Sequence, residues 1–401
     1  MTNDLIPAPN VELVRAANVP NFLNKIRPQW QAKSLIKRVE VLLEVDPSSA
    51  CQRLLNASIH DLKEKVVIAG VDIASEAAKQ HKLPPVTNAD DIEHYSTAKL
   101  IDLAYRMGLL SRPEWRRVSR CYEIRRDLEH EDDEYEAGVE DCVYIFSTCI
   151  DVILSRDPIQ LIRVTDFKNL IEQATAVIPD AVVLEDYERA PQKRQEEILK
   201  LLISYALDKA TADVVQQNAF SCLSYLRSIT HQATLVTIGQ YLQDRAGRSI
   251  DARMARVANA IGVFPYLRQS ARLSFFESVL QNMLKVGTHW SAYEKHGELL
   301  RTFKDYGGLE NCTPEVRKDV LRYLVLTYVG NPGGRTQYGN IRHVYYSNTA
   351  APLIEEIINS AASTIKSDLQ SFSSDTKIKA VLSTDHLSRR FEALLDLVED
   401  H

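Results

Sequence analysis

The chain has 401 residues, which is long for one compact domain, so we expect two or three domains. Hydrophobic residues make up 45% of it and charged residues 25%, values that exclude a collagen-like, coiled-coil or largely disordered chain. The net charge of −6 excludes a generally basic surface, so any site for a polyanion has to be local. The 14 glycines are about half the average usage of ~7%, and turn-rich β folds need more, so the composition predicts an all-α fold.

The cysteines form no CxxC pair and have no regular spacing, so the sequence predicts neither a zinc site nor a disulfide framework. We expect reduced thiols that serve as small core residues. The first twenty residues lack the basic and apolar regions of a signal peptide, and no apolar run approaches the ~18 residues that span a bilayer. We therefore expect a cytoplasmic protein without a membrane contact. The cysteines are Cys51, Cys121, Cys142, Cys149, Cys222 and Cys312.

The first part of the chain predicts an N-terminal helical bundle over 33–157. Residues 1–32 contain four prolines and little periodicity, which indicates an extended or loosely helical lead-in. Apolar residues from Leu55 to Ala77 then recur at steps of three and four, as on one face of a long helix. Asp157-Pro158 ends the bundle, and we place the domain boundary there. The predicted elements are a helix over 52–78, a polar loop over 81–91, and helices over 98–110, 114–129 and 139–153.

The second part, 158–401, predicts an irregular multi-helical domain with a recognition or regulatory role. Pro191 begins one amphipathic helix, and the apolar residues from Phe391 to Val398 share the face of another. The short run 181–184 fits a strand or a helical turn equally well. No fixed repeat emerges, so a regular solenoid is not expected.

One segment of this second domain, 330–346, concentrates four of the chain's 14 glycines. It also carries Arg335 and Arg342, which are suited to binding phosphates, and three tyrosines that could stack on bases. One interpretation is a helix–helix connection with glycine caps, and the other is a loop that binds a ligand, RNA or a protein partner.

The strongest local signal is a reversal of charge at the end of the predicted helix over 114–129. From Arg112 to Arg126 there are six arginines and two glutamates, a net charge of +4. From Asp127 to Asp141 there are nine acids and neither Lys nor Arg, a net charge of −9. The end of one helix followed by the start of the next explains most of the acidic run, because carboxylates stabilise a helix N-terminus.

That explanation does not account for His130, which lies inside the acidic run, five residues after Arg125. Five residues rotate an unbroken α-helix by about 140°, so these two side chains share a face only if the helix breaks, whereas Arg126 and His130 share one without a break. An arginine that binds a charged phosphorane and a histidine that moves a proton are the groups that cleavage of RNA needs. One chain supplies only one such histidine here. The other histidines form no metal-ligand motif, so we expect no metal and no cofactor.

At these residues the chain resembles the HEPN superfamily, helical bundles whose signature is an arginine, four to six intervening residues and a histidine. Arg125 to His130 fits with four intervening residues. The surroundings are similar too, with Gly108 and Trp115 before the motif and a long amphipathic helix that starts near Glu140 and Cys142 after it. The helix over 52–78 corresponds to the first long helix of such a bundle. The resemblance covers roughly 33–156.

The resemblance implies a homodimer in which two copies of the motif face each other and form one cleft. Arg125 is then the group that binds the scissile phosphate and His130 the general acid or base, with Arg120 and Arg126 as further phosphate contacts. The products are a 2′,3′-cyclic phosphate and a 5′-hydroxyl, formed without a metal. Arg126 departs from the family, since many active members have Asn, Asp or His directly after the arginine.

Two hypotheses follow. The first is a metal-independent endoribonuclease that acts as a homodimer, as a toxin or antiphage effector, and whose C-terminal domain binds a substrate, a protein partner or an antitoxin. The second is a catalytically inactive HEPN-fold scaffold or regulatory subunit, in which Arg126 and the acidic run mark the loss of cleavage.

Overall fold

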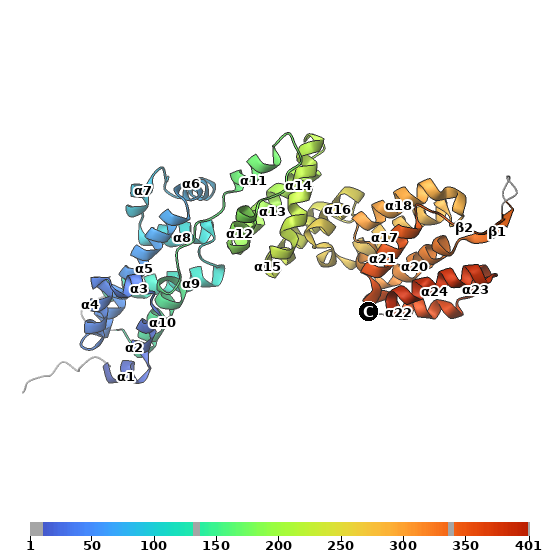
Figure 1. The fold of residues 1–401 in the computed structure, drawn as a ribbon. Helices are drawn as coiled ribbons and strands as arrows, with labels where there is room; N and C mark the ends of the chain where they lie inside the picture. Colours follow the sequence, from blue (N-terminus) through green and yellow to red (C-terminus); the bar gives the residue numbers. More distant parts are fainter. Residues whose placement is uncertain (1–10, 131–136, 336–340, 400–401) are drawn as a thin grey trace, which may run out of the picture. The chain divides into compact units, whose positions relative to one another are not determined.

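The computed structural model describes residues 11–130, 137–335 and 341–399, with the backbone alone at 11, 12, 15 and 128–130. Within these residues the fold is all-α apart from one two-stranded antiparallel sheet, as predicted (Figure 1). The chain forms two compact units. The first unit contains residues 1–166 and 185–195, and the second contains 167–184 and 196–401. The first boundary between the units, near residue 166, lies eight residues beyond the predicted boundary at Pro158.

The first unit is a helical bundle built around one long helix, α5. Helices α4, α8, α9 and α10 all pack against α5, and their apolar residues form one continuous core. Several core side chains, among them Leu54, Leu62 and Phe146, are fully enclosed. The elements are α1 (Val11–Ala16), α2 (Val19–Phe22), η1 (Leu23–Lys25), α3 (Pro28–Gln31), α4 (Ser34–Leu43), α5 (Pro47–Ala69), α6 (Val71–Gln80), α7 (Ala89–Glu93), α8 (Thr97–Met107), α9 (Arg112–His130), α10 (Val139–Cys149) and the π-helical η2 (Ile150–Leu154).

The lead-in is more ordered than its prolines suggest. From residue 11 it forms short helices, and Pro20 and Pro28 occupy first-turn positions, where the missing N–H breaks no helical hydrogen bond. Val19, Ile26 and Trp30 are buried in the core of the bundle. Within residues 11–32 the lead-in is therefore helical rather than extended, because burial of these side chains holds the short helices in place.

The single helix predicted over 52–78 is two helices, α5 and α6, separated at Gly70. The apolar stripe continues across the break, since Val66, Ile73 and Ala77 are all buried. Gly70 has φ 127°, a conformation that L side chains rarely adopt. The periodicity of the apolar residues correctly predicted which side chains are buried. It did not predict the break in the helix at Gly70.

Glu114 fixes the start of α9. Its carboxylate accepts hydrogen bonds from the Ser111 N–H at 2.8 Å and from the Arg156 guanidinium at 2.5 Å. Burial raises the pKa of Glu114, but donation from Arg156 and Ser111 outweighs burial, and the pKa lies below its usual value.

A pH-dependent contribution to stability is expected from Glu114. A carboxyl whose folded pKa is lowered stabilises the fold above its unfolded pKa of about 4.3, and that contribution is lost as the pH falls through the folded pKa. Urea unfolding of the native chain and of Glu114→Gln should differ by about 0.5–1 kcal/mol at pH 7 and converge below pH 4. A difference that grows as the pH falls would contradict this assignment.

An ionic cluster is enclosed in the first unit. Asp61 of α5 is fully buried, its Oδ1 binds Arg27 and its Oδ2 lies 3.0 Å from Lys65 Nζ. Arg27 also donates to the carbonyl of Arg156, and Lys65 donates to the carbonyl of Ile153. Burial raises the pKa of Asp61 and lowers that of Lys65. The cluster therefore joins the lead-in, α5 and the end of η2 through buried charges.

All six cysteines are buried and free, as predicted. Cys51 of α5 contacts Cys142 of α10 at an Sγ–Sγ distance of 3.5 Å, in the core between the two helices. Burial raises the pKa of Cys222 to about 11 and also raises the pKa of Cys312. The six thiols are therefore packed inside the protein as small core side chains.

The second unit is an irregular series of helices, and α11 to α13 contribute residues to both units. The run 181–184 is the start of helix α12, and Pro191 precedes α13 directly. The elements are α11 (Val164–Ile171), α12 (Ala181–Arg189), α13 (Gln192–Leu207), α14 (Asp213–Leu226), η3 (Arg227–Ile229), α15 (Gln232–Ala246), α16 (Ala252–Ile261), η4 (Phe264–Tyr266), α17 (Gln269–Val286), η5 (Trp290–Ala292), α18 (Tyr293–Asp305), α19 (Gly308–Asn311), α20 (Pro314–Val329), β1 (Asn331–Arg335), β2 (Ile341–Tyr345), α21 (Ala351–Ser360), α22 (Ala362–Ser371), η6 (Phe372–Ser374), α23 (Thr376–Val381) and α24 (Asp385–Glu399).

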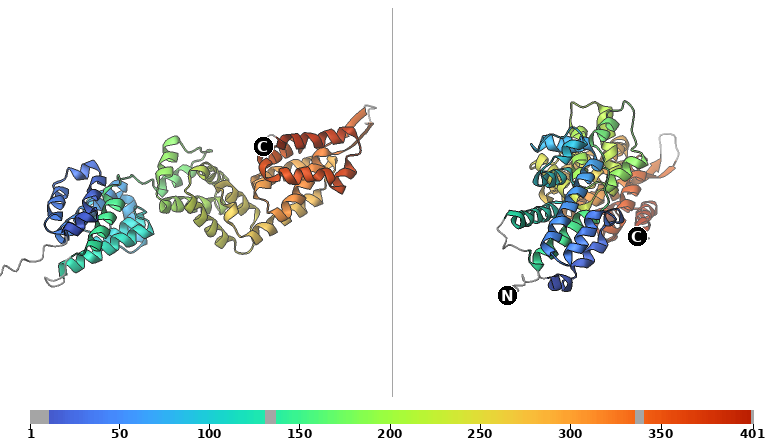
Figure 2. Two further views of the ribbon diagram at one scale, coloured as in Figure 1. Left: turned by 90° about the horizontal axis from the view of Figure 1, so that it is seen from below. Right: turned by 90° about the vertical axis from the view of Figure 1, so that its left-hand side faces the viewer.

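The glycine-rich segment forms an antiparallel hairpin and is not an irregular connection. Asn331 pairs with Tyr345 and Gly334 with Arg342. In both Figure 1 and Figure 2 the hairpin extends beyond the ends of the helices around it. A Cβ at Gly333 would lie 1.9 Å from the Arg342 carbonyl oxygen, so only glycine lets the strands approach this closely.

Gly333→Ala is expected to open the hairpin. The new methyl group meets backbone and cannot be relieved by a rotamer change, which predicts a cost of about 1–3 kcal/mol. Trp290 stacks on Tyr345 at 5.1 Å between ring centroids, so its fluorescence reports the change. Gly334→Ala is the matched control, because a Cβ there meets no described atom within 4 Å. Equal spectra for the two variants would contradict the register.

In the residues that the structure describes, no helix is both long enough and apolar enough to cross a membrane.

Candidate functional site

Helix α9 carries the predicted motif and packs on the bundle through one apolar face. Val118, Cys121 and Ile124 of this face are buried. Trp115 stacks on Tyr105 of α8 with 5.3 Å between ring centroids, which fixes the first half of α9 on the neighbouring helix. The predicted boundaries, 114–129, agree with the observed helix.

The three predicted arginines of α9 differ in their surroundings. Arg125 is half-buried and follows the buried Cys121 by one helical turn, which places it on the border of the core-facing side. The Arg120 side chain is 58% exposed and lies 3.2 Å from Glu123. The Arg126 side chain is 60% exposed and lies 4.0 Å from Asp127. Arg125 is thus the least exposed of the three.

His130 is the last residue of α9, and its side chain lies outside the described part of the structure. The helix is continuous from Arg112, so positions 125 and 130 are about 140° apart around its axis. Positions 126 and 130 are about 40° apart. The motif positions are close along the helix, but within one chain they do not lie on one face.

The chain after the acidic run returns to the bundle at a defined point. The Ala137 N–H donates to Ser48 Oγ at 2.8 Å, and the Gly138 N–H donates to Asp141 at 3.4 Å. Glu140 and Asp141 lie in the first turn of α10, where carboxylates are favourable, so the capping explanation holds for these two acids. Residues 131–136, which carry five of the acids, lie outside the described residues.

The other two predicted phosphate-binding residues lie on the hairpin of the second unit. Arg335 is the last residue of β1 and pairs with Ile341, and Arg342 of β2 pairs with Gly334. Both arginines are exposed. The two arginines are one position out of register, so they lie on opposite faces of the described hairpin, and they belong to a different unit from α9.

Sequence reasoning missed the contacts that fix the hairpin to α24. The Arg390 guanidinium lies over the ring of Tyr328 at 4.3 Å and that of Tyr346 at 4.0 Å, and its Nη2 donates to the Tyr328 carbonyl at 2.6 Å. His343 of β2 stacks on His386 of α24 with 4.3 Å between centroids. These partners are more than forty residues apart in the chain, so no local pattern could have paired them.

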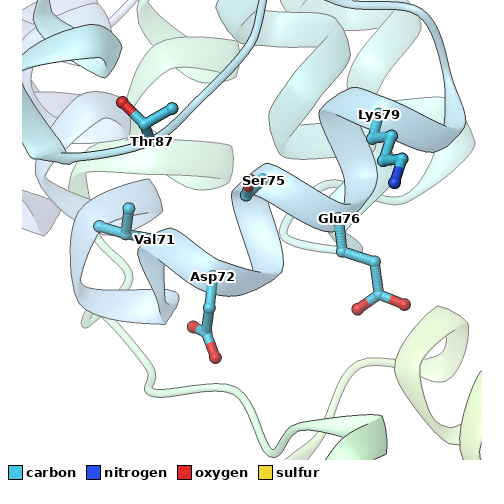
Figure 3. Close-up of a pocket in the computed structure, with 6 residues that line it drawn as sticks. All are labelled: Val71, Asp72, Ser75, Glu76, Lys79 and Thr87. Atoms are coloured by element: carbon cyan, nitrogen blue, oxygen red, sulfur yellow. The ribbon is translucent and has the colours of Figure 1, made fainter.

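A shallow hollow on α6 contains none of the predicted site residues. Figure 3 shows Asp72 and Glu76 pointing away from the helix on one side, with Lys79 at its end. Asp72 lies 3.5 Å from Arg163. The hollow is lined by Val71, Asp72, Ser75, Glu76, Lys79 and Thr87.

Comparison with known proteins identifies no relative, because no family model, curated protein or solved structure matches the chain.

Proposed function

We propose that the N-terminal bundle is a metal-independent endoribonuclease that works as a homodimer. The observation that carries the proposal is the arginine–histidine motif at the end of α9, where Arg125 is half-buried and positioned by the core. A partly enclosed guanidinium is less free to move than a surface one, and it binds a phosphate by two parallel hydrogen bonds.

In the proposed reaction the 2′-hydroxyl of a ribose attacks the adjacent phosphorus, and the bond to the 5′-oxygen breaks. One His130 takes the proton of the 2′-hydroxyl, and the second His130 of the dimer gives a proton to the leaving 5′-oxygen. Arg125 stabilises the charge of the phosphorane. Arg120 and Arg126 contact neighbouring phosphates. The products are a 2′,3′-cyclic phosphate and a 5′-hydroxyl.

The need for two chains follows from the number of histidines. The proposed reaction uses two histidines, and each chain supplies one in this motif. A twofold axis beside α9 would supply the second histidine from the partner copy. The proposed context, a toxin or antiphage effector, rests on the family resemblance alone.

The hairpin is the proposed second contact with RNA. Replacing Arg335 and Arg342 with glutamine should weaken binding of an RNA oligonucleotide and reduce the slope of log K against log salt by about 1.4, since each lost phosphate contact on a single strand is worth about 0.7. Fluorescence anisotropy at several salt concentrations measures this slope. An unchanged slope would remove the hairpin from the RNA-binding surface.

The second candidate is a catalytically inactive HEPN-fold scaffold or regulatory subunit. The unbroken course of α9 through His130 favours it, and so does a second arginine where many active members of the HEPN superfamily carry Asn, Asp or His. In this case the bundle still dimerises, but the two copies of His130 lie too far apart to act on one phosphate.

Degradation of labelled RNA in excess EDTA, by the native chain and by His130→Ala, tests the proposal. The nuclease predicts cutting by the native chain alone. Cutting by neither chain supports the scaffold, and equal cutting by both places any nuclease activity elsewhere.

A further inference from the structure

We propose that a cavity in the second unit binds a small phosphomonoester of a hydroxyl-rich compound, such as a sugar phosphate. The cavity lies beside α13, α14 and α16, which are neighbours in Figure 1, and has a volume of about 210 Å³. This is below the ~300–1,000 Å³ of sites for drug-sized ligands, so the occupant is small. It is lined by Ala206, Asp213, Gln216, Gln217, Phe220, Arg253, Arg256 and Val257.

Arg253 is the feature that points to an anion. It is half-buried, and its Nη1 is enclosed by protein without a hydrogen-bond partner among the described residues. A buried guanidinium nitrogen without a hydrogen-bond partner costs free energy, and an anion beside the group offsets part of that cost. Arg253 lines the cavity, so an anion there would lie beside its positive charge.

Arg256 does not require an anion from outside the protein, because Asp305 already pairs with it. Its Nε lies 3.1 Å from Asp305 Oδ2, and its guanidinium lies over the ring of Phe220 at 5.1 Å. Arg256 therefore lines the cavity with a charge that Asp305 already balances. The two arginines are one helical turn apart on α16, and of the two only Arg256 has an ion pair of 4 Å or less within the described structure.

In the proposed site, Asp213 is the second group that binds the ligand, by accepting a hydrogen bond from one of its hydroxyls. It is exposed, it lines the same cavity as Arg253, and no ion pair of 4 Å or less joins the two in the described residues. Opposite charges that face one space without touching leave room for a ligand between them. Such a ligand presents its anion to Arg253 and a hydroxyl donor to Asp213.

The helix ends favour the same ligand. Asp213 is the first residue of α14 and Arg253 the second of α16, so the first turns of both helices contribute to the lining. The dipole at such ends attracts negative charge, and at α16 the Asp251 carboxylate already accepts from the Met254 N–H. A phosphate matches the planar guanidinium of Arg253. This site does not depend on the proposed nuclease activity.

Isothermal titration of the full chain with ribose 5-phosphate, inorganic phosphate and ribose tests the proposal. We expect ribose 5-phosphate to bind more tightly than inorganic phosphate and ribose not to bind. Arg253→Gln should weaken ribose 5-phosphate binding about 10- to 100-fold, because a charge-assisted contact is lost. Arg248→Gln, an exposed arginine of the same unit, should leave it unchanged.

Asp213→Asn provides a second variant at an exposed position, where loss of folding is not expected. It should reduce the preference for ribose 5-phosphate over inorganic phosphate, since the asparagine removes a carboxylate that accepts from the sugar and repels the phosphate. No binding of either phosphate compound, equal binding by native and Arg253→Gln, or binding of a 5′-phosphorylated RNA oligonucleotide alone would each overturn the proposal.

Discussion

Arg125→Ala is expected to lower the rate of RNA cleavage by about 10²–10³-fold, which is the usual loss when one donor to the developing charge is removed. Arg125 is half-buried beside the core face of α9, and in the proposed reaction its guanidinium stabilises the phosphorane. The measurement is the initial rate on labelled RNA at fixed ionic strength in EDTA.

Arg126→Ala is the matched control for this prediction. The Arg126 side chain is 60% exposed and one position further along α9, so its loss should lower the rate by less than about tenfold. Arg125→Lys keeps the positive charge but loses the planar guanidinium that donates two parallel hydrogen bonds. We expect this variant to cleave RNA well below the native rate. Equal losses of cleavage rate for Arg125→Ala and Arg126→Ala would show that these arginines only attract RNA. The melting temperatures of all variants distinguish a loss of folding from a loss of catalysis.

Asp61→Ala is expected to destabilise the first unit by about 3–5 kcal/mol, because it leaves two buried cations without their shared counter-ion. Asp61 is fully buried, and the Arg27 and Lys65 side chains are 7% and 9% exposed. Urea unfolding followed by circular dichroism measures the loss. Because the cluster joins three segments, limited proteolysis of the variant should also cut earlier in the lead-in.

Asp72→Ala gives the control for the buried cluster. Asp72 also pairs with an arginine, Arg163, but both side chains are more than half exposed, so the pair is worth about 0–1 kcal/mol. The replacement of Asp61 and Lys65 together by apolar residues should cost less than Asp61→Ala alone, since it removes charges of both signs. Similar small losses for Asp61→Ala and Asp72→Ala would contradict the role of the cluster.

The helices were predictable where one apolar face fixed them. The helix predicted over 98–110 is α8, which ends three residues earlier at Met107, because Gly108 adopts φ 86° and caps it. The motif on α9 was equally visible, since it depends on residue types at a fixed spacing. Patterns with a period near 3.6 report which residues are buried, and that information is local in the chain.

The features that escaped prediction depend on contacts between distant residues. The hairpin sequence lacks the alternation of apolar and polar residues that is typical of a half-buried strand. The close approach of the two strands at Gly333 depends on the position of the Arg342 backbone, which the sequence does not give. Asp61 lies 34 residues from Arg27 in the chain, and Asp213 lies 40 residues from Arg253. Neither the ion pair of Asp61 and Arg27 nor the shared cavity of Asp213 and Arg253 has a sequence signature, because the fold brings these residues together and their spacing does not.

The chemical ends of the RNA products test the account most directly. We predict that the native chain, in excess EDTA, produces fragments with a 2′,3′-cyclic phosphate and a 5′-hydroxyl, and that Arg125→Ala and His130→Ala produce almost none. Mass spectrometry of a short oligonucleotide of defined sequence distinguishes these ends. Fragments with a 5′-phosphate and a 3′-hydroxyl, or the same cyclic products from His130→Ala, would contradict the account.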